Sequence, residues 1–261
     1  MLNELKEQVW RANLQLVKEG LVIQTWGNAS GIDRASRTVV IKPSGVSYED
    51  LKAEQMVVVS LDTGKVLEGD LKPSSDTPTH LVLYRAFAGI GGVVHTHSFC
   101  ATAWAQARCD IPALGTTHAD YFHGAIPCTR LLREKEIRSD YEESTGNVIV
   151  ERFMRLEPNE IPGVLVASHG PFTWGPTVKD AVENAAVLEH LAKLASETLR
   201  INYSINSMQR SLLERHYTRK HGIDAYYGQT PPNPSQPAQG PPPTMSHPGY
   251  LLRPWASKYL K

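Results

Sequence analysis

The chain has 261 residues, of which 41% are hydrophobic and 21% are charged, so it can bury a sizeable core. Lysine plus arginine totals 27, as does aspartate plus glutamate, and this zero net charge argues against a nucleic-acid-binding protein. The 3 cysteines lack zinc-finger or redox spacing, which argues against a disulfide scaffold and favours a reducing compartment. The sequence shows no signal-peptide pattern and no run of about 18 apolar residues, so we expect a cytoplasmic protein without a membrane partner.

The first half of the chain predicts a mixture of helices and strands. Apolar side chains recur at helical spacing over residues 2–20, which end in a glycine typical of a helix C-terminus. Residues 37–42 are typical of a strand, and residues 56–67 are typical of a hairpin around an Asp-Thr-Gly turn. A Thr-Pro pair predicts the start of a helix over residues 77–87, and residues 92–97 predict a buried strand that leads into another helix.

The second half adds an apolar strand over residues 163–167 and two long helices over residues 178–200 and 208–220. Strands that alternate irregularly with helices predict an α/β or α+β sheet covered by helices, with a topology that periodicity does not decide. Residues 1–229 are predicted to form one domain. Residues 230–261 contain 9 prolines and are predicted to be a disordered or polyproline tail.

The most informative feature for chemistry is the sequence His95-Thr96-His97. On a strand, residues i and i+2 face the same side about 6–7 Å apart, so their two imidazoles can converge on one ion. Such a pair alone is more often structural, but His169 ends another predicted strand and Asp76 lies at a predicted helix start. Three histidines and a carboxylate predict a divalent metal site, and imidazole suits zinc, copper, iron or nickel.

Three short segments are candidates for binding a phosphate group. They offer small residues, backbone amides and hydroxyl groups, and one of them precedes a predicted helix start, where amide groups favour an anion. Each segment taken alone is more typical of an ordinary turn than of a phosphate site. The candidate residues are Gly27, Asn28, Ser44, Gly45, Ser74 and Ser75, with Lys42 as a source of positive charge.

Five motifs occur in order along the chain, at residues 73–80, 92–97, 115–121, 126–129 and 220–229. They include Pro-Ser-Ser-Asp-Thr-Pro-Thr-His, Gly-Val-Val-His-Thr-His and Gly-Thr-Thr-His-Ala-Asp-Tyr. Together they resemble the L-ribulose-5-phosphate 4-epimerases of the class II aldolase superfamily, and the resemblance extends over residues 1–229. It implies an α/β fold of three layers in a single domain, with a central, predominantly antiparallel sheet flanked by helices.

The resemblance also implies a role for each matching residue. His95, His97 and His169 match zinc ligands, so the expected cofactor is Zn²⁺, and Asp76 matches a carboxylate beside the metal. Related aldolases carry a glutamate at the position of Asp76, so an aspartate favours an epimerase over an aldolase. The family places a lysine at the position of Lys42, and the phosphate-binding candidates gain support as a set.

The resemblance further implies that part of the site comes from another subunit. Asp120 and Tyr227 match the two acid/base residues of the epimerases. His216 and Arg219 match residues that reach the site of a neighbouring subunit. We therefore expect a homo-oligomer, a tetramer with four-fold symmetry, that acts on a small sugar phosphate.

The expected reaction interconverts L-ribulose 5-phosphate and D-xylulose 5-phosphate, in pentose or ascorbate breakdown. The nearest alternative is an aldolase of the L-fuculose 1-phosphate type. A third hypothesis is a catalytically inactive relative that acts as a binding module through its proline-rich tail. Dinucleotide-binding, P-loop and Gly-x-Ser-x-Gly motifs do not occur, which argues against nucleotide-dependent enzymes and α/β-hydrolases.

Overall fold

The computed structural model describes residues 2–222 and 225. Tyr227 and the proline-rich segment at residues 230–261 therefore lie outside the described residues. The helices are α1 (Leu2–Lys18), η1 (Ala53–Gln55, a 3₁₀ helix), α2 (Thr77–Ala86), α3 (Phe99–Ala107), α4 (Thr116–Ala119), α5 (Glu134–Arg138), α6 (Tyr141–Arg152), α7 (Val178–Ile201) and α8 (Arg210–His221). The strands are β1 (Asn28–Asp33), β2 (Thr38–Ile41), β3 (Val57–Ser60), β4 (Val66–Glu68), β5 (Gly92–His95), β6 (Gly163–Leu165) and β7 (Pro171–Gly175).

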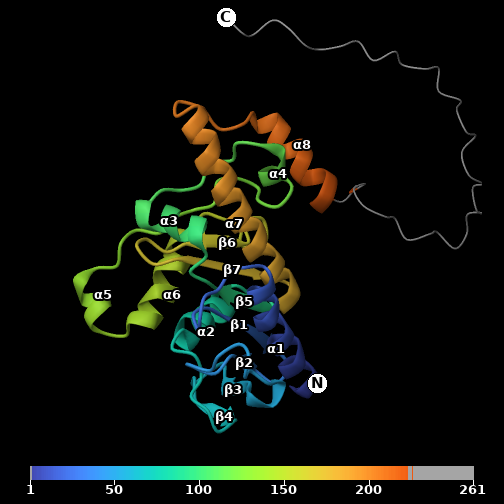
Figure 1. Ribbon diagram of the computed structural model, residues 1–261, viewed down its shortest axis with the longest axis vertical. Helices are drawn as coiled ribbons and strands as arrows, with labels where there is room; N and C mark the ends of the chain where they lie inside the picture. The colour runs from blue at the N-terminus through green and yellow to red at the C-terminus, as the bar shows by residue number, and fades with distance from the viewer. Residues whose placement is uncertain (1, 223–224, 226–261) are drawn as a thin grey trace, which may run out of the picture. The chain divides into compact units, whose positions relative to one another are not determined.

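The strands form one seven-stranded sheet in the order β4-β3-β2-β1-β5-β7-β6 (Figure 1). Each strand is antiparallel to its neighbours in this order. β5 lies between β1 and β7, and in this register His95 pairs with Asn28 on one side and Phe172 on the other. The predicted antiparallel sheet is confirmed, and its register brings distant parts of the sequence together at the end of β5.

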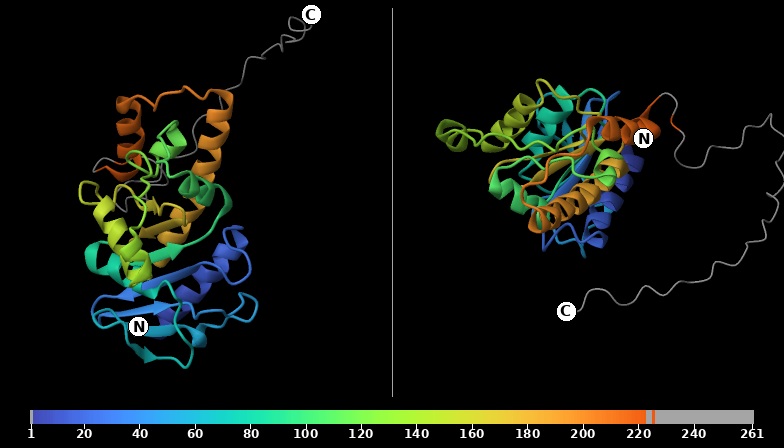
Figure 2. Two further views of the ribbon diagram at one scale, coloured as in Figure 1. Left: turned by 90° about the vertical axis from the view of Figure 1, so that its left-hand side faces the viewer. Right: turned by 90° about the horizontal axis from the view of Figure 1, so that it is seen from above.

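Helices cover both faces of the sheet (Figure 2). Successive residues of a strand point to opposite faces, and on β5 both Val93 and Val94 are buried, each in a different apolar cluster. One cluster includes side chains of α2, α3, α6 and the second half of α7, and the other includes side chains of α1 and the first half of α7. The three-layer arrangement therefore follows from strands that are apolar on both sides.

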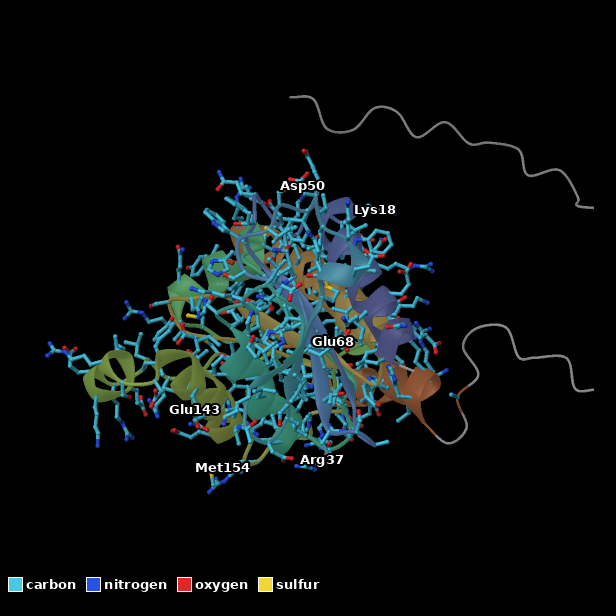
Figure 3. All side chains as sticks on the ribbon, turned by 90° about the horizontal axis from the view of Figure 1, so that it is seen from below. Lys18, Arg37, Asp50, Glu68, Glu143 and Met154 are labelled. Carbon is cyan, nitrogen blue, oxygen red and sulfur yellow. The ribbon has the colours of Figure 1, made fainter. Side chains whose placement is uncertain are left out.

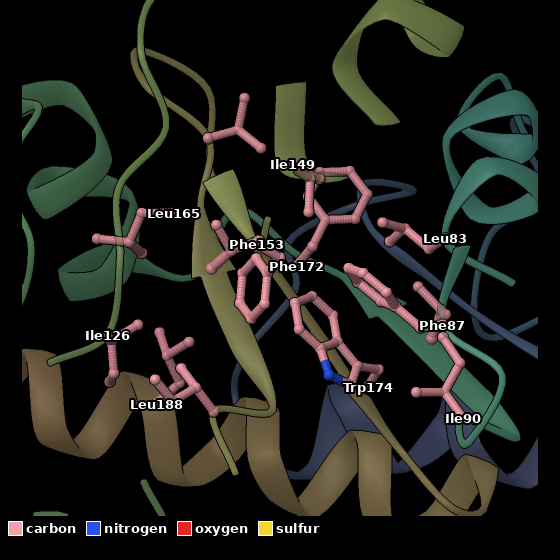
Figure 4. Close-up of a cluster of buried hydrophobic side chains, with 14 of the residues drawn as sticks. Leu83, Phe87, Ile90, Ile126, Ile149, Phe153, Leu165, Phe172, Trp174 and Leu188 are labelled. Atoms are coloured by element: carbon pink, nitrogen blue, oxygen red, sulfur yellow. The ribbon is translucent and has the colours of Figure 1, made fainter. Parts of the chain in front are cut away.

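Aromatic side chains fill much of the cluster that includes α2 and α6 (Figure 4). The ring centroids of Phe87, Phe153 and Trp174 lie 5.0–5.5 Å apart, in tilted or edge-to-face arrangements that aromatic pairs prefer. The Trp174 indole N–H donates to the carbonyl of Pro158 at 2.8 Å, so its polar atom is satisfied although the ring is buried.

The sheet and α7 approach each other closely because β5 begins with a glycine. A Cβ atom at Gly92 would lie 2.4 Å from the Cα of Val178, at the first turn of α7. The helix starts there because Thr177 and Asp180 form reciprocal capping hydrogen bonds, at 3.2 Å and 3.0 Å. A larger side chain at Gly92 would push the helix away from the sheet.

The outer surface carries charged side chains together with exposed apolar ones. Lys18, Arg37 and Asp50 are exposed at the periphery of the molecule (Figure 3), and so is the apolar side chain of Met154, at 81% exposure. Within the part of the chain that the structure describes, no helix combines the length and the apolar character that crossing a bilayer would require.

Replacing Leu188 with alanine should destabilise the fold by about 2–5 kcal/mol, because this fully buried side chain of α7 packs in the aromatic-rich cluster (Figure 4). The matched control is Leu194→Ala on the same helix. Leu194 is 42% exposed, so we expect a change within about 0.5 kcal/mol. Denaturant unfolding of both variants measures the difference, and equal midpoints would contradict the packing described here.

Candidate metal centre and adjoining cavity

Three histidines converge at one end of β5. The candidate ligand nitrogens of His95, His97 and His169 all lie within 4.8 Å of one another, and the Nε2 atoms of His95 and His97 are 3.1 Å apart. The three side chains differ in exposure: His95 is buried, His169 is half-buried and His97 is exposed. Three imidazoles with one open side are the donor set of a catalytic metal site, in which a further position stays free for substrate oxygens.

Local backbone geometry places each imidazole. His95 is the last residue of β5, whereas His97 lies two residues beyond the strand, so the two do not share one strand face as the sequence had suggested. His169 lies in the tight turn between β6 and β7, where Ser168 has a positive φ of 60°. Gly170 completes this turn, and a Cβ atom there would lie 2.8 Å from the carbonyl oxygen of Thr96.

The orientation of His95 is fixed by a backbone hydrogen bond. Its Nδ1 atom lies 3.0 Å from the carbonyl oxygen of Pro171, and a carbonyl can only accept, so Nδ1 carries the hydrogen. Its ring also stacks on Phe172, with centroids 4.1 Å apart. Nε2 is left with a lone pair that faces the other histidines, which is the usual arrangement of a metal-ligating histidine.

The other two imidazoles are held in the neutral form that metal binding requires. Burial lowers the pKa of His169 to about 3, and the neighbouring histidines contribute to this shift. Burial also lowers the pKa of His97, with His95 as a smaller cause. Around neutral pH neither ring needs to lose a proton before it can bind an ion.

Asp76 lies beside this cluster, at the N-cap position of α2. The Asn28 Nδ2 group donates to Asp76 Oδ2 at 2.6 Å and to Ser74 Oγ at 3.0 Å. Burial acts to raise the pKa of Asp76, but the neighbouring imidazoles and the hydrogen bond from Asn28 lower it below its ordinary value. The structure therefore holds an ionised carboxylate next to the three histidines.

A single cavity of about 500 Å³ joins this cluster to the predicted phosphate-binding segments. Two of these segments are joined to each other by backbone hydrogen bonds, because the Ser44 amide donates to the carbonyl of Lys72 and the Ser74 amide donates to the carbonyl of Lys42. The Oδ1 atom of Asn28 is buried without a hydrogen-bond partner among the described residues, so it can accept from a bound molecule. Predicted residues that line the cavity are Gly27, Asn28, Lys42, Ser44, Gly45, Ser74, Ser75, Asp76, His95, His97 and His169.

Lys42 supplies a buried positive charge to the cavity. Only 2% of the residue is exposed, and its Nζ atom donates to the carbonyl of Val46 at 2.9 Å and lies 4.8 Å from the Tyr48 ring centroid. Burial lowers the pKa of Lys42 to about 8. An anion in the cavity would favour the charged form of this amine.

The sequence motifs did not identify five further residues that line the same cavity, namely Thr25, Trp26, Pro43, Tyr141 and Glu142. Trp26 is 52% exposed, and its ring centroid lies 6.2 Å from that of His97. Tyr141 begins α6, and its hydroxyl lies 3.5 Å from His169 Nδ1. Trp26 could have been found from its position directly before Gly27, whereas nothing in the local sequence marks Tyr141.

Asp120 belongs to a separate cluster, between α4 and α8. It accepts hydrogen bonds from Arg219, at 2.8 Å to Oδ2, and from His216, at 3.0 Å to Oδ1. Burial acts to raise the pKa of Asp120, but these two hydrogen bonds lower it below its usual range. None of these three residues lines the cavity with the histidines. The structure thus brings Asp120, His216 and Arg219 together within one chain, apart from the cavity.

The chain belongs to the class II aldolase family, because the family model "Class II Aldolase and Adducin N-terminal domain" matches residues 7–196. A solved L-fuculose 1-phosphate aldolase has the same fold, with a TM-score of 0.70 and 23% identity over 84% of this chain and 96% of that one. YgbL from Klebsiella pneumoniae is similar, with a TM-score of 0.66 and 24% identity over 82% of this chain and 98% of that one.

Two curated relatives are each 56% identical over 228 residues, which is 87% of this chain and 100% of the relative. Both are named L-ribulose-5-phosphate 4-epimerase UlaF, one from Salmonella paratyphi C (strain RKS4594) and one from Salmonella choleraesuis (strain SC-B67). These names agree with the group of enzymes that the sequence motifs resemble.

Replacing His97 with asparagine should lower the metal content of the purified protein, because one of three converging imidazoles is lost. The control is His190→Asn, a substitution of the same kind at an exposed position of α7. Elemental analysis of the desalted proteins measures bound metal per chain. Equal metal content in wild type, His97→Asn and His190→Asn would show that the ion is held elsewhere.

Proposed function

We propose that this protein is a zinc-dependent L-ribulose-5-phosphate 4-epimerase, which interconverts L-ribulose 5-phosphate and D-xylulose 5-phosphate. The observation that carries the proposal is that one cavity contains the three histidines, Asp76 and all the predicted phosphate-binding residues. The names of relatives that are 56% identical support the same reaction. We further propose that residues 1–229 form the catalytic domain.

The chemistry explains why such a site needs both a metal and proton-transfer groups. C4 of the substrate is not adjacent to the carbonyl, so simple proton abstraction does not invert it. A base removes the proton of the C4 hydroxyl, the electrons of the C3–C4 bond move toward the C2 carbonyl, and an enediolate and glycolaldehyde phosphate result. Rotation of the aldehyde, re-formation of the C3–C4 bond and return of the proton to the C4 oxygen then give the epimer. A divalent cation would supply Lewis-acid stabilisation of the negative charge that develops.

The residues of the cavity divide between the two ends of the substrate. The phosphate group would bind to the amides and hydroxyls of the segments at residues 44–45 and 74–75, with Lys42 as the counter-charge. His95, His97 and His169 would hold a divalent cation, which would supply Lewis-acid chemistry at the carbonyl end of the substrate. Asn28 contacts Asp76 and Ser74, so it would link the phosphate-binding segment to the metal centre.

Proton transfer is assigned to Asp120 and Tyr227, one on each face of the aldehyde. Asp120 does not line the cavity of its own chain, and Tyr227 lies outside the described residues. We propose that a neighbouring subunit of a cyclic homotetramer supplies these residues, together with His216 and Arg219. A neighbour that closes the open side of the cavity would also exclude water from the reacting atoms.

Incubation of the purified protein with L-ribulose 5-phosphate should produce D-xylulose 5-phosphate, because the enediolate and the aldehyde recombine before release. The measurement is a coupled assay for xylulose 5-phosphate, with a parallel assay for free glycolaldehyde phosphate. The control is His97→Asn, which should give neither product. Free glycolaldehyde phosphate as the main product would favour an aldolase instead.

Replacing Asp120 with asparagine should lower the kcat for epimerisation by about 10²–10⁴-fold while metal content stays unchanged, because Asp120 transfers a proton and is not a ligand. If sites are shared, mixing Asp120→Asn with His97→Asn under conditions that exchange subunits should restore activity. In a random mixture, about a quarter of the sites would combine an intact metal centre with an intact Asp120 from the neighbour. Proven hybrids without recovered activity would show that each chain builds its site alone.

A further inference from the structure

His123 lies between two carboxylates from different parts of the chain. Its Nδ1 atom is 2.9 Å from Glu160 Oε2, and its Nε2 atom is 2.8 Å from Glu214 Oε2. Glu160 precedes β6, and Glu214 lies on α8. The imidazole therefore connects α8 to the segment that leads into the sheet.

Both contacts can be hydrogen bonds only if the imidazole carries two hydrogens. An ionised carboxylate accepts but does not donate, and a neutral imidazole has a single N–H group. The geometry of His123 is therefore that of an imidazolium with a carboxylate at each end. The two carboxylates lie on opposite ring nitrogens, so they do not converge on a common point as metal ligands would.

An aromatic stack extends from His123 to Asp120. The His123 ring lies parallel to that of Tyr217, with centroids 4.4 Å apart, and Tyr217 stacks on His221 at 4.5 Å. The Nε2 atom of His221 lies 3.0 Å from the backbone carbonyl oxygen of Asp120. A cation over the face of a tyrosine is stabilised by the ring, so the stack also favours a charged His123.

The charged groups around His123 are mostly acidic. Glu160 and Glu214 contact it directly, Glu157 lies close enough to Tyr217 to influence that phenol, and Arg210 contacts Glu214 at 3.3 Å. Burial acts to lower the pKa of His123, but the two glutamates raise it above its ordinary value. Below the pKa of a free histidine, about 6.5, the two bonds are fully formed, and one of them is lost as the pH rises through the higher folded-state value.

We propose that His123 is a positioning residue that, as an imidazolium, clamps α8 to the segment before β6 and thereby sets the position of the Asp120 cluster. His216 and Arg219, which hold the Asp120 carboxylate, lie on the same helix. Loss of the clamp loosens α8 and lets these two side chains move relative to Asp120. The clamp itself does not depend on the proposed function, whereas its effect on turnover does.

The test is hydrogen exchange of the α8 backbone amides as a function of pH, with α7 as the internal reference. In the wild type, protection of α8 relative to α7 should fall by about tenfold between about pH 6 and pH 9, as the imidazolium loses a proton. His123→Gln should show the lower protection at every pH, because glutamine is uncharged and both of its N–H groups are on one nitrogen, so it does not bridge two carboxylates that lie at opposite ring nitrogens. His190→Gln, at an exposed position of α7, is the matched control and should behave as the wild type.

Glu160→Gln provides a second, milder variant. It removes one of the two carboxylates that favour the charged imidazole. The pH at which half of the protection of α8 is lost should therefore be lower than in the wild type. This variant keeps the proposal testable if His123→Gln does not fold. Protection of α8 that is independent of pH in the wild type, or a midpoint that Glu160→Gln does not move, would overturn the clamp.

The consequence for turnover is measured separately in the epimerase assay. His123 does not line the cavity, so His123→Gln should lower kcat, by up to about 10²-fold, with little change in KM or metal content. Wild-type protein without epimerase activity would overturn the proposed function but leave the exchange result valid. An unchanged kcat in His123→Gln, together with the expected exchange behaviour, would show that the clamp does not position Asp120.

Discussion

The hydrogen bond between His95 Nδ1 and the carbonyl of Pro171 joins the sheet to the candidate metal centre. It forms because β5 and β7 are antiparallel neighbours in a register that pairs His95 with Phe172. His169 lies in the turn between β6 and β7, directly before the strand that pairs with β5. A slip by one residue would turn His95 to the other face of the sheet and separate it from His169.

A second buried network joins β1 to α2, the helix that follows Asp76. Ser30 on β1 contacts both His80 Nδ1, at 2.7 Å, and the hydroxyl of Tyr84, at 2.9 Å. His80 and Tyr84 lie one turn apart on α2, so these contacts fix that helix against the strand. Burial lowers the pKa of His80 to about 3, which keeps it neutral beside the ionised Asp76. These contacts fasten the first turns of α2 to β1, next to the carboxylate that lies beside the histidines.

The sequence predicted the elements whose side chains show a clear period or boundary signal. The apolar run of β3 and the start of α7 are examples, and both are confirmed. β1 was not predicted, because Asn-Ala-Ser-Gly-Ile-Asp resembles a loop. Asn28 and Ser30 are buried there, where the Asn28 Nδ2 group donates to Ser74 and the Ser30 hydroxyl contacts Tyr84. Gly31 is required there, because a Cβ atom would lie 2.6 Å from the Val178 side chain of α7 and 2.8 Å from the Leu5 side chain of α1. These neighbours of β1 come from distant parts of the sequence, so a local pattern does not show them.

The candidate site shows the same division between local and tertiary information. The histidines, Asp76 and the phosphate-binding candidates were identified because short motifs carry them, and the structure brings them into one cavity. Tyr141 was missed, because its place beside His169 depends on how α6 packs against α2. The contacts of His123 were equally hidden, because they join residues 37 and 91 positions apart in the sequence.

The electrostatics of Asp120 bear on how a shared site would work. A carboxylate that Arg219 and His216 hold in its ionised form is a weak base, whereas a catalytic base works best with a pKa near the working pH. Burial is the influence that already acts to raise the pKa of Asp120 in the single chain. Contact with a neighbouring subunit would increase that burial and strengthen its effect. Assembly would then do more than bring Asp120 to the substrate, because the same contact would also shift the carboxylate toward the basicity that proton transfer requires.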